Sequence, residues 1–216
     1  MKRVYDIAIV TDETSWFVPY AKQLAEKLIA KGHNCIVRHL FDAQKHYDFC
    51  FLLSCSKLIS EEELSCNQHN LVVHGSDLPK GRGWSPLTWA ILEGVDRSAI
   101  TLFEAASGVD SGKIYIQKHM EFDGSELVEE LRQKQAVCIL DACEIFLASY
   151  PEILKAAREQ SGEASYYRKR TPEDSELDVN KSIREQFNLL RVVDNERYPA
   201  YFFLRGKKYI LKIFKG

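Results

Sequence analysis

The chain has 216 residues, of which 45% are apolar and 28% charged, and its formal net charge is −2. No window approaches the ~18 apolar residues of a membrane span, and the near-neutral charge is unlike the basic face of a nucleic-acid-binding protein. We therefore expect a soluble, cytoplasmic protein with neither a membrane nor a nucleic-acid partner. The length predicts a main domain over 1–160 and a smaller C-terminal extension over 161–216.

Strands and helices alternate along the first half of the chain. Short apolar, β-branched runs predict strands at 4–11, 35–39, 48–53 and 70–74. Helical periodicity predicts helices at 17–30, 61–64 and 86–93. This order predicts the α/β class, a Rossmann-like open and mostly parallel sheet with helices on both faces.

The second half is less regular. Alternating patterns predict an antiparallel pair at 99–104 and 113–121, and a long amphipathic helix follows at 125–149. Residues 160–164 have the composition of a linker. A helix at 181–190 and a β-hairpin over 198–214 complete the prediction, and the apolar hairpin leaves open a monomer or a homodimer.

The stretch HGSDLPKGRGWSP, residues 74–86, joins a predicted strand to a predicted helix. Its loop is longer than the usual connection of about 2–6 residues, and it leaves the sheet edge where open α/β sheets bind ligands. His74 ends the strand, and Asp110 lies in a turn between two glycines. Histidine can act as an acid or base and a carboxylate can orient it. From these residues alone, a purely structural role for both stays open.

Other chemistries lack their motifs. The sequence contains no glycine-rich dinucleotide motif, no P-loop and no nucleophile elbow. Its six cysteines show no C-x-x-C spacing, so we predict neither disulfides nor a metal site.

The run from His74 to Pro86, followed by Val109-Asp110-Ser-Gly112, resembles the signature of the 10-formyltetrahydrofolate-dependent formyltransferases. In that family a catalytic His precedes S-L-L-P, R-G and P, and an Asp follows the His by 36 residues, as Asp110 follows His74 here. The segments 165–178 and 191–208 resemble the family's continuation, so the resemblance covers essentially the whole chain. It implies transfer of a formyl group from the co-substrate 10-formyltetrahydrofolate to a primary amine.

The resemblance also implies residue roles. His74 would donate to the oxyanion that develops when the amine attacks, and Asp110 would hold His74 or help to accept the proton. Residues 51–59 would supply the pterin-binding backbone, and the loop 75–83 would shape the edge of the folate pocket. The implied cofactor-binding residues are Ser54, Cys55, Lys57, Leu58, Ser76, Leu78, Arg82, Gly83 and Asp110.

Two positions depart from the family pattern. The family's Asn two residues before the His is Val72 here. Asn70 lies on the same face of the predicted strand, so we consider it as a catalytic replacement. Asp77 stands where the family has Leu, which places a carboxylate either beside the pocket or in solvent.

Three branches of the family act on a small ribonucleotide, on aminoacylated initiator tRNA, or on a nucleotide-linked amino sugar. The tRNA branch carries a further C-terminal domain and the ribonucleotide branch lacks this tail, so we expect a nucleotide-linked amino sugar as partner. The short form with VVH, SDLPKGRGWSP and ITLFEA resembles the branch of pseudaminic acid biosynthesis. Its implied acceptor is UDP-4-amino-4,6-dideoxy-N-acetyl-altrosamine. The predicted substrate contacts are Ser15, Trp16, Lys80, Arg168 and Arg170.

Other functions remain open at this point. The acceptor could be methionyl-tRNA or another amine. A folate-binding protein without transfer activity, or a hydrolase that releases formate from the same folate, would also fit the Val72 departure.

Overall fold

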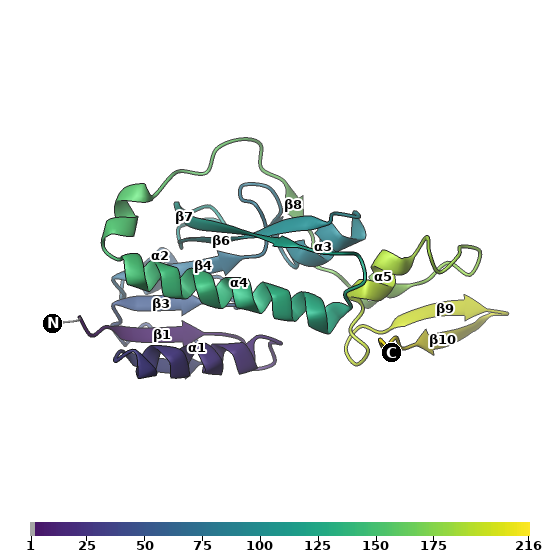
Figure 1. Ribbon diagram of the computed structural model, residues 1–216, viewed down its shortest axis with the longest axis horizontal. Helices are drawn as coiled ribbons and strands as arrows, with labels where there is room; N and C mark the ends of the chain where they lie inside the picture. The colour runs from purple at the N-terminus through teal and green to yellow at the C-terminus, as the bar shows by residue number, and fades with distance from the viewer. Residues whose placement is uncertain (1–2) are drawn as a thin grey trace.

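The computed structural model describes residues 3–216 and centres on a six-stranded sheet of order β2-β1-β3-β4-β6-β7 (Figure 1). Four neighbouring strands are parallel, and the last two are antiparallel to their neighbours. The strands are β1 (Asp6–Val10), β2 (Asn34–Arg38), β3 (Phe49–Leu52), β4 (His69–His74), β6 (Arg97–Glu104) and β7 (Ile114–Glu121). The predicted open, mostly parallel α/β sheet is therefore confirmed.

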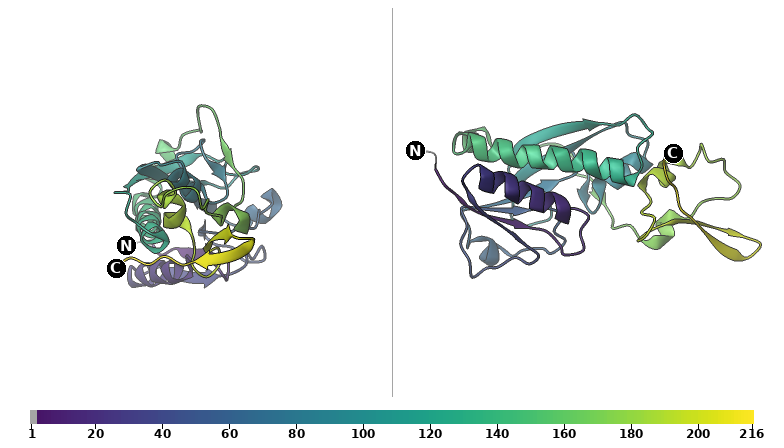
Figure 2. Two further views of the ribbon diagram at one scale, coloured as in Figure 1. Left: turned by 90° about the vertical axis from the view of Figure 1, so that its right-hand side faces the viewer. Right: turned by 60° about the horizontal axis from the view of Figure 1, so that its bottom comes forward.

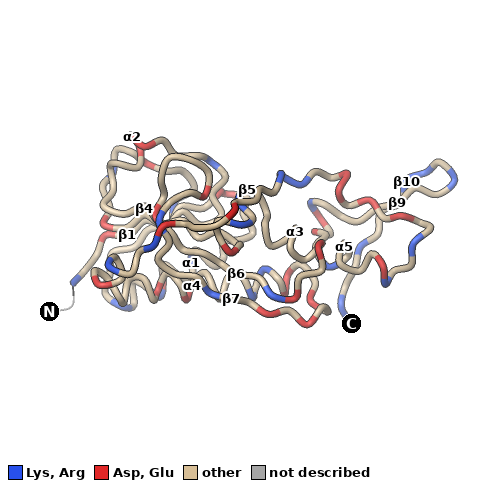
Figure 3. Tube along the Cα trace, turned by 90° about the horizontal axis from the view of Figure 1, so that it is seen from above, with Lys and Arg blue, Asp and Glu red and all other residues tan. Residues whose placement is uncertain are grey.

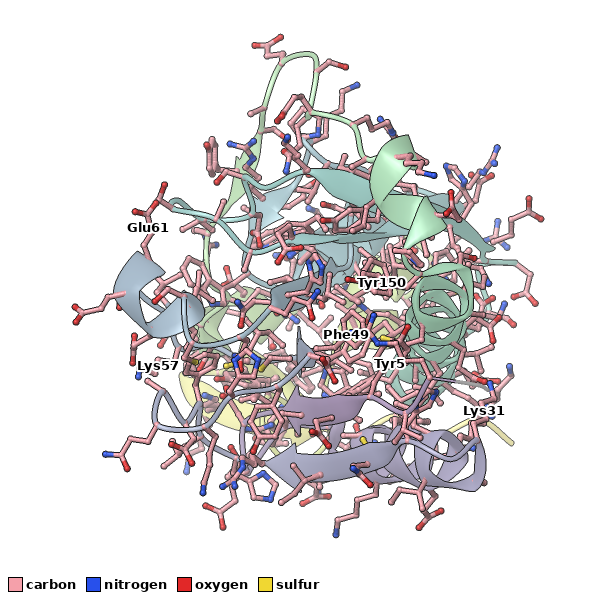
Figure 4. All side chains as sticks on the ribbon, turned by 90° about the vertical axis from the view of Figure 1, so that its left-hand side faces the viewer. Tyr5, Lys31, Phe49, Lys57, Glu61 and Tyr150 are labelled. Carbon is pink, nitrogen blue, oxygen red and sulfur yellow. The ribbon has the colours of Figure 1, made fainter. Side chains whose placement is uncertain are left out.

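Two long helices cover one face of the sheet. α1 (Val18–Ala30) and α4 (Val128–Ser149) lie on the same side of it (Figure 2). Their apolar positions recur with the helical period, and Leu24 and Phe146 are completely buried against the strands. Tyr5, Phe49 and Tyr150 fill the end of this layer, where the Phe49 ring lies 4.9 Å from each tyrosine ring (Figure 4). This face is a continuous apolar core.

The opposite face has a thinner cover. A single helical turn, α2 (Glu61–Leu64), packs Leu64 against the side chains of β1 and β3. Ser60 begins this turn by accepting a hydrogen bond from the Glu63 amide, and Glu63 accepts one from the Ser60 amide in return. Loops cover the remainder of this face.

The chain between β4 and β6 holds α3 (Pro86–Leu92) and the two-residue strand β5 (Arg82–Gly83). β5 pairs in parallel with β8 (Tyr166–Tyr167), which follows the short helix η1 (Glu152–Ala156). The sequence patterns did not predict this pair.

The C-terminal extension adds η2 (Pro172–Ser175), α5 (Phe187–Val192) and a hairpin of β9 (Ala200–Leu204) and β10 (Lys207–Leu211), which projects away from the sheet (Figure 1). The helix predicted over 181–190 is wrong in its bounds. The amides of Gln186 and Phe187 bond to carbonyl oxygens three residues earlier, in turns, so the continuous helix starts only at Phe187.

A buried ion pair joins the extension to the loop between β7 and α4. Arg191 in α5 donates to the carboxylate of Glu126 at 3.0 Å, and both residues are 3% exposed. Burial favours a higher pKa for Glu126, but hydrogen bonds from Lys134 and the Asp123 amide outweigh it and lower the pKa to about 2.

Charged residues of both signs are interspersed along the described chain (Figure 3). Within residues 3–216, no helix combines the length and the apolar character that crossing a membrane requires.

Candidate active site

His74 and Asp110 meet at the carboxyl edge of β4. The Nε2 hydrogen of His74 is donated to the Gly81 carbonyl oxygen at 2.8 Å, and Nδ1 lies 3.6 Å from Oδ1 of Asp110. The side chains are only 11% and 14% exposed. The fold thus brings together the two residues that the sequence pattern singles out.

The Asp110 backbone adopts a left-handed conformation, with φ of +51°. This region is unfavourable for a residue with a side chain and persists where the surroundings fix it. Its carboxylate accepts a hydrogen bond from the Gly83 amide at 3.0 Å. A Cβ on Gly83 would overlap the carbonyl oxygen of Tyr167, so the pairing of β5 with β8 requires glycine at this position.

A row of polar side chains anchors the loop after His74. Thr101 on β6 lies opposite His74, and Gln117 on β7 lies opposite Thr101. Thr101 donates to the Ser76 carbonyl at 2.7 Å, while Gln117 donates to Asp77 at 2.8 Å. Asp77 is exposed, and its hydrogen bond to Gln117 holds it to the sheet. Ser76, the residue before it in the loop, is buried.

A cavity lies beside the pair, on the face that α2 covers. Its apolar wall includes Leu52, Val72 and Phe103, and Leu78 packs against the latter two from behind. Four of the residues predicted to bind the cofactor line it: Cys55, Lys57, Leu58 and Asp110. The walls suit a flat, largely apolar ring, and the carboxylate of Asp110 marks the polar end.

The thiol at this cavity has little thiolate character. Burial raises the pKa of Cys55 above its ordinary value, against the smaller opposing effect of the Lys57 backbone. The ammonium group of Lys57 lies 3.0 Å from Glu63 at the outer side of the cavity. Among residues 3–216, no group of three or more His, Cys, Asp or Glu side chains is placed to hold a metal ion.

Two of the predicted contact residues meet at the carboxyl ends of β1 and β3. The hydroxyl groups of Ser15 and Ser54 share a hydrogen bond of 2.8 Å. Trp16 packs on Phe17, and the guanidinium of Arg132 lies 6.0 Å from its ring centre. Trp16 is thus half-buried in the molecule's own packing.

The basic residues predicted to bind substrate lie in different settings. Lys80 is exposed on the loop after β4. Arg168 binds the Asp174 carboxylate with both terminal nitrogens and lies 4.8 Å above the ring of Trp89. Arg170 points into the extension, donating to the Asp174 carbonyl at 3.0 Å, and burial lowers its pKa. The structure brings neither arginine to the cavity.

Asn70 does not reach the pair. Its amide nitrogen donates to the Leu64 carbonyl at 2.8 Å, and its oxygen accepts from Asn67 at 2.9 Å. Since a strand rises about 3.3 Å per residue, Asn70 lies about 13 Å from His74. The side chain braces α2 from the amino end of β4, so the structure gives no support to the catalytic role considered for Asn70.

Gln160 is a site neighbour that the sequence patterns missed. Its amide nitrogen donates to the carbonyl oxygens of Asp110 and Gly112 at 2.8 and 3.0 Å, and its oxygen accepts from Arg82 at 2.6 Å. A single glutamine in a segment of linker composition has no local signal, because its partners lie about fifty residues or more away in sequence.

Comparisons with known proteins agree with this geometry. The chain is 29% identical to methionyl-tRNA formyltransferase from Thermodesulfovibrio yellowstonii, over 78% of this chain and 54% of that protein. The matched part of this chain thus spans about half of that relative's length. In another curated relative it spans a quarter of the length.

Solved structures show the same fold. HypX from Aquifex aeolicus in complex with tetrahydrofolic acid superposes with a TM-score of 0.77 at 18% identity, over 98% of this chain and 38% of that one. A 4-N formyltransferase from Francisella tularensis superposes with a TM-score of 0.68 at 18% identity, over 96% of this chain and 97% of that one.

A family model described as formyl transferase matches residues 10–138. The match covers more than half of the 216 residues and includes His74, the loop that follows it and Asp110. This chain belongs to the formyl transferase family.

Proposed function

We propose that the protein transfers a formyl group from 10-formyltetrahydrofolate to the primary amine of a nucleotide-linked amino sugar. The observation that carries the proposal is the His74–Asp110 pair, of which Asp110 lines a cavity. Family membership supports the reaction class. The sugar acceptor is supported by the likeness in fold to a sugar N-formyltransferase from Shewanella, which superposes over 96% of this chain and 97% of that one.

When bound, the folate would supply a formyl carbonyl carbon that the amine nitrogen can attack. As the new carbon–nitrogen bond forms, the bond from this carbon to N10 of the folate breaks, and the proton that the amine loses goes to N10. His74 then donates from Nε2 to the carbonyl oxygen, which takes the place of the Gly81 oxygen that this nitrogen now meets. Asp110 faces Nδ1, where it holds the imidazole in orientation and stabilises positive charge on the ring. Its second oxygen stays fixed by the Gly83 amide.

Val72 gives this site an apolar wall where the family resemblance leads us to expect an amide. We infer that His74 carries the stabilisation of the oxyanion with less help from the side of β4. The finer proposal for the acceptor is UDP-4-amino-4,6-dideoxy-N-acetyl-altrosamine, which rests on the sequence resemblance.

A second acceptor class has one observation in its favour. The curated relative with 29% identity is a methionyl-tRNA formyltransferase, so methionyl-tRNA belongs among the acceptors to test. The mixed distribution of charge in Figure 3 favours the sugar nucleotide over a polyanion.

The test measures release of tetrahydrofolate from 10-formyltetrahydrofolate, with UDP- and dTDP-linked amino sugars, with methionyl-tRNA, and without acceptor. Mass analysis of each acceptor follows. We expect release that depends on one amino sugar, adds one formyl mass to it, and is lost in His74→Ala and Asp110→Ala. Release without acceptor would indicate a hydrolase, and folate binding without release would indicate a binding protein.

A further inference from the structure

The side chain of Gln160 lies where two loops of the site meet. Its amide nitrogen donates to two carbonyl oxygens of the turn that carries Asp110, at 2.8 and 3.0 Å. Its oxygen accepts from Arg82 on the loop after β4, at 2.6 Å. One half-buried amide therefore connects both segments, using its nitrogen for one and its oxygen for the other.

These two segments are the ones that hold the His74–Asp110 pair. On one side of Arg82, the Gly81 carbonyl accepts from His74, and on the other the Gly83 amide donates to Asp110. The left-handed backbone of Asp110 needs outside support, and Gln160 binds the carbonyl group of that very residue. A shift of this contact would move the carboxylate relative to Nδ1.

Gln160 is itself fixed from both sides along the segment 158–167, which we call the strap. At its start, the backbone of Arg158 forms two hydrogen bonds with Ile114 on β7, of 2.8 and 3.0 Å. At its end, Ser165 accepts from the Gly81 amide at 2.8 Å and from the Arg82 amide at 2.9 Å. Figure 1 shows this segment arching from η1 over the sheet edge to β8.

We propose that Gln160 is a positioning residue for the His74–Asp110 pair. Its amide fixes the Asp110 turn against the Arg82 loop, so that the carboxylate stays aimed at the imidazole. Gln160 acts through the backbone of Asp110 and has no contact of its own with the imidazole. The inference rests on the proposed formyl transfer for its kinetic readout.

The isosteric variant Gln160→Glu separates the two halves of the contact. The carboxylate still accepts from Arg82, but it has no hydrogen for the Asp110 and Gly112 carbonyl oxygens and repels them. Gln160→Met removes both halves at similar length and without charge. Glu159→Gln is the matched control, because this neighbouring side chain is exposed and pairs with Lys113, which is exposed as well.

The experiment combines steady-state kinetics with ¹⁵N NMR of histidine-labelled protein. We expect Gln160→Glu and Gln160→Met to lower kcat by about 10- to 100-fold, since a misplacement near 1 Å costs about this much. The KM for 10-formyltetrahydrofolate should change by less than about 3-fold, because the apolar wall of Leu52, Val72 and Phe103 stays in place. The control should keep kcat within about 2-fold.

The NMR readout does not depend on turnover. The ring nitrogen signals of His74 should move in both variants of Gln160, while those of the other five histidines and the melting temperature stay nearly unchanged. Folded variants with wild-type kcat and an unmoved His74 signal would overturn the inference. If the wild-type protein transfers no formyl group, the proposed function fails, and the His74 signals alone decide the role of Gln160. If Gln160→Glu does not fold, Gln160→Met decides it.

Discussion

β4 begins and ends with a histidine that faces a carboxylate. At its amino end, Nδ1 of His69 lies 3.0 Å from Glu104, and at its carboxyl end, Nδ1 of His74 lies 3.6 Å from Asp110. The two imidazole side chains are buried to a similar degree, 15% and 11% exposed. Neither the pairing nor the burial distinguishes them.

Their surroundings do. The His69 ring stacks on Phe49 with ring centres 5.7 Å apart. The Glu104 carboxylate also accepts hydrogen bonds from the backbone amide of Asn70 at 2.7 Å and from the Tyr115 hydroxyl at 2.9 Å. The His69 ring also packs edge-on against Phe146 of α4, with ring centres 6.4 Å apart. The His74 pair instead lies between loops with left-handed backbone, beside a cavity. A neighbouring cavity and loops, more than the pairing itself, make a histidine–carboxylate pair a candidate for catalysis.

The largest effect should follow from His74→Ala. We expect kcat for formyl transfer to fall by about 10²- to 10⁴-fold, the usual contribution of a positioned acid or base. The free energy of unfolding should fall by about 1–2 kcal/mol, because the change removes the hydrogen bond to the Gly81 carbonyl. Kinetics and thermal unfolding of the same sample test both statements, and a loss below 10-fold would contradict the assignment.

His69→Ala should give the opposite result. It removes a packed ring and leaves Glu104 with one donor fewer, so the free energy of unfolding should fall by about 2–4 kcal/mol. Urea unfolding measures this loss. The folded fraction should keep kcat within about 3-fold, and a larger kinetic defect would mean that the amino end takes part in the reaction.

Asn70→Ala tests which end of the strand Asn70 serves. Because its amide bonds to Leu64 and Asn67, we expect a loss of about 1–2 kcal/mol in the free energy of unfolding and an unchanged kcat. A fall in kcat comparable to that of His74→Ala, in a protein of full stability, would return Asn70 to the catalytic set.

Tyr115→Phe should have the smallest effect at neutral pH, about 1 kcal/mol for one hydrogen bond. Burial, followed by the charge of Glu104, raises the pKa of Tyr115 well above its ordinary value of 10. A raised pKa stabilises the fold below pH 10, and this stability is lost as the unfolded chain ionises at higher pH. The variant should therefore lose less stability than wild type above pH 10. Tyr209→Phe on the exposed hairpin provides the matched control at neutral pH.

Sequence patterns predict the layers of this molecule well. Both long helices carry clear periods because each buries one face, and β3 and all but the first residue of β1 are continuous apolar runs because both of their faces are buried. The two-residue strands β5 and β8 are too short to show a period, and the boundary predicted at residue 160 runs through the segment that joins them to the site. The helix start near Phe187 depends on a local turn that the apolar pattern does not record.

The site divides in the same way. The structure brings His74 and Asp110 to one edge of the sheet, where strand ends and loops follow from the strand pattern. Arg170 was expected at the substrate, yet its partners, Ser175 and the Val192 carbonyl, became its neighbours only through the folding of the extension. The position of Gln160 in the site could not be predicted for the same reason, since its contacts with Asp110 and Arg82 join segments distant in sequence.

The order of synthesis gives the strap a further consequence. A ribosome makes the sheet before it makes β8, and the 57 residues from Asp110 to Tyr167 take about 3–11 s at about 5–20 residues per second. During that time the nascent chain carries both members of the pair but lacks the segment that binds their two loops together. The strap can therefore fix the two loops only after all six strands of the sheet have been made.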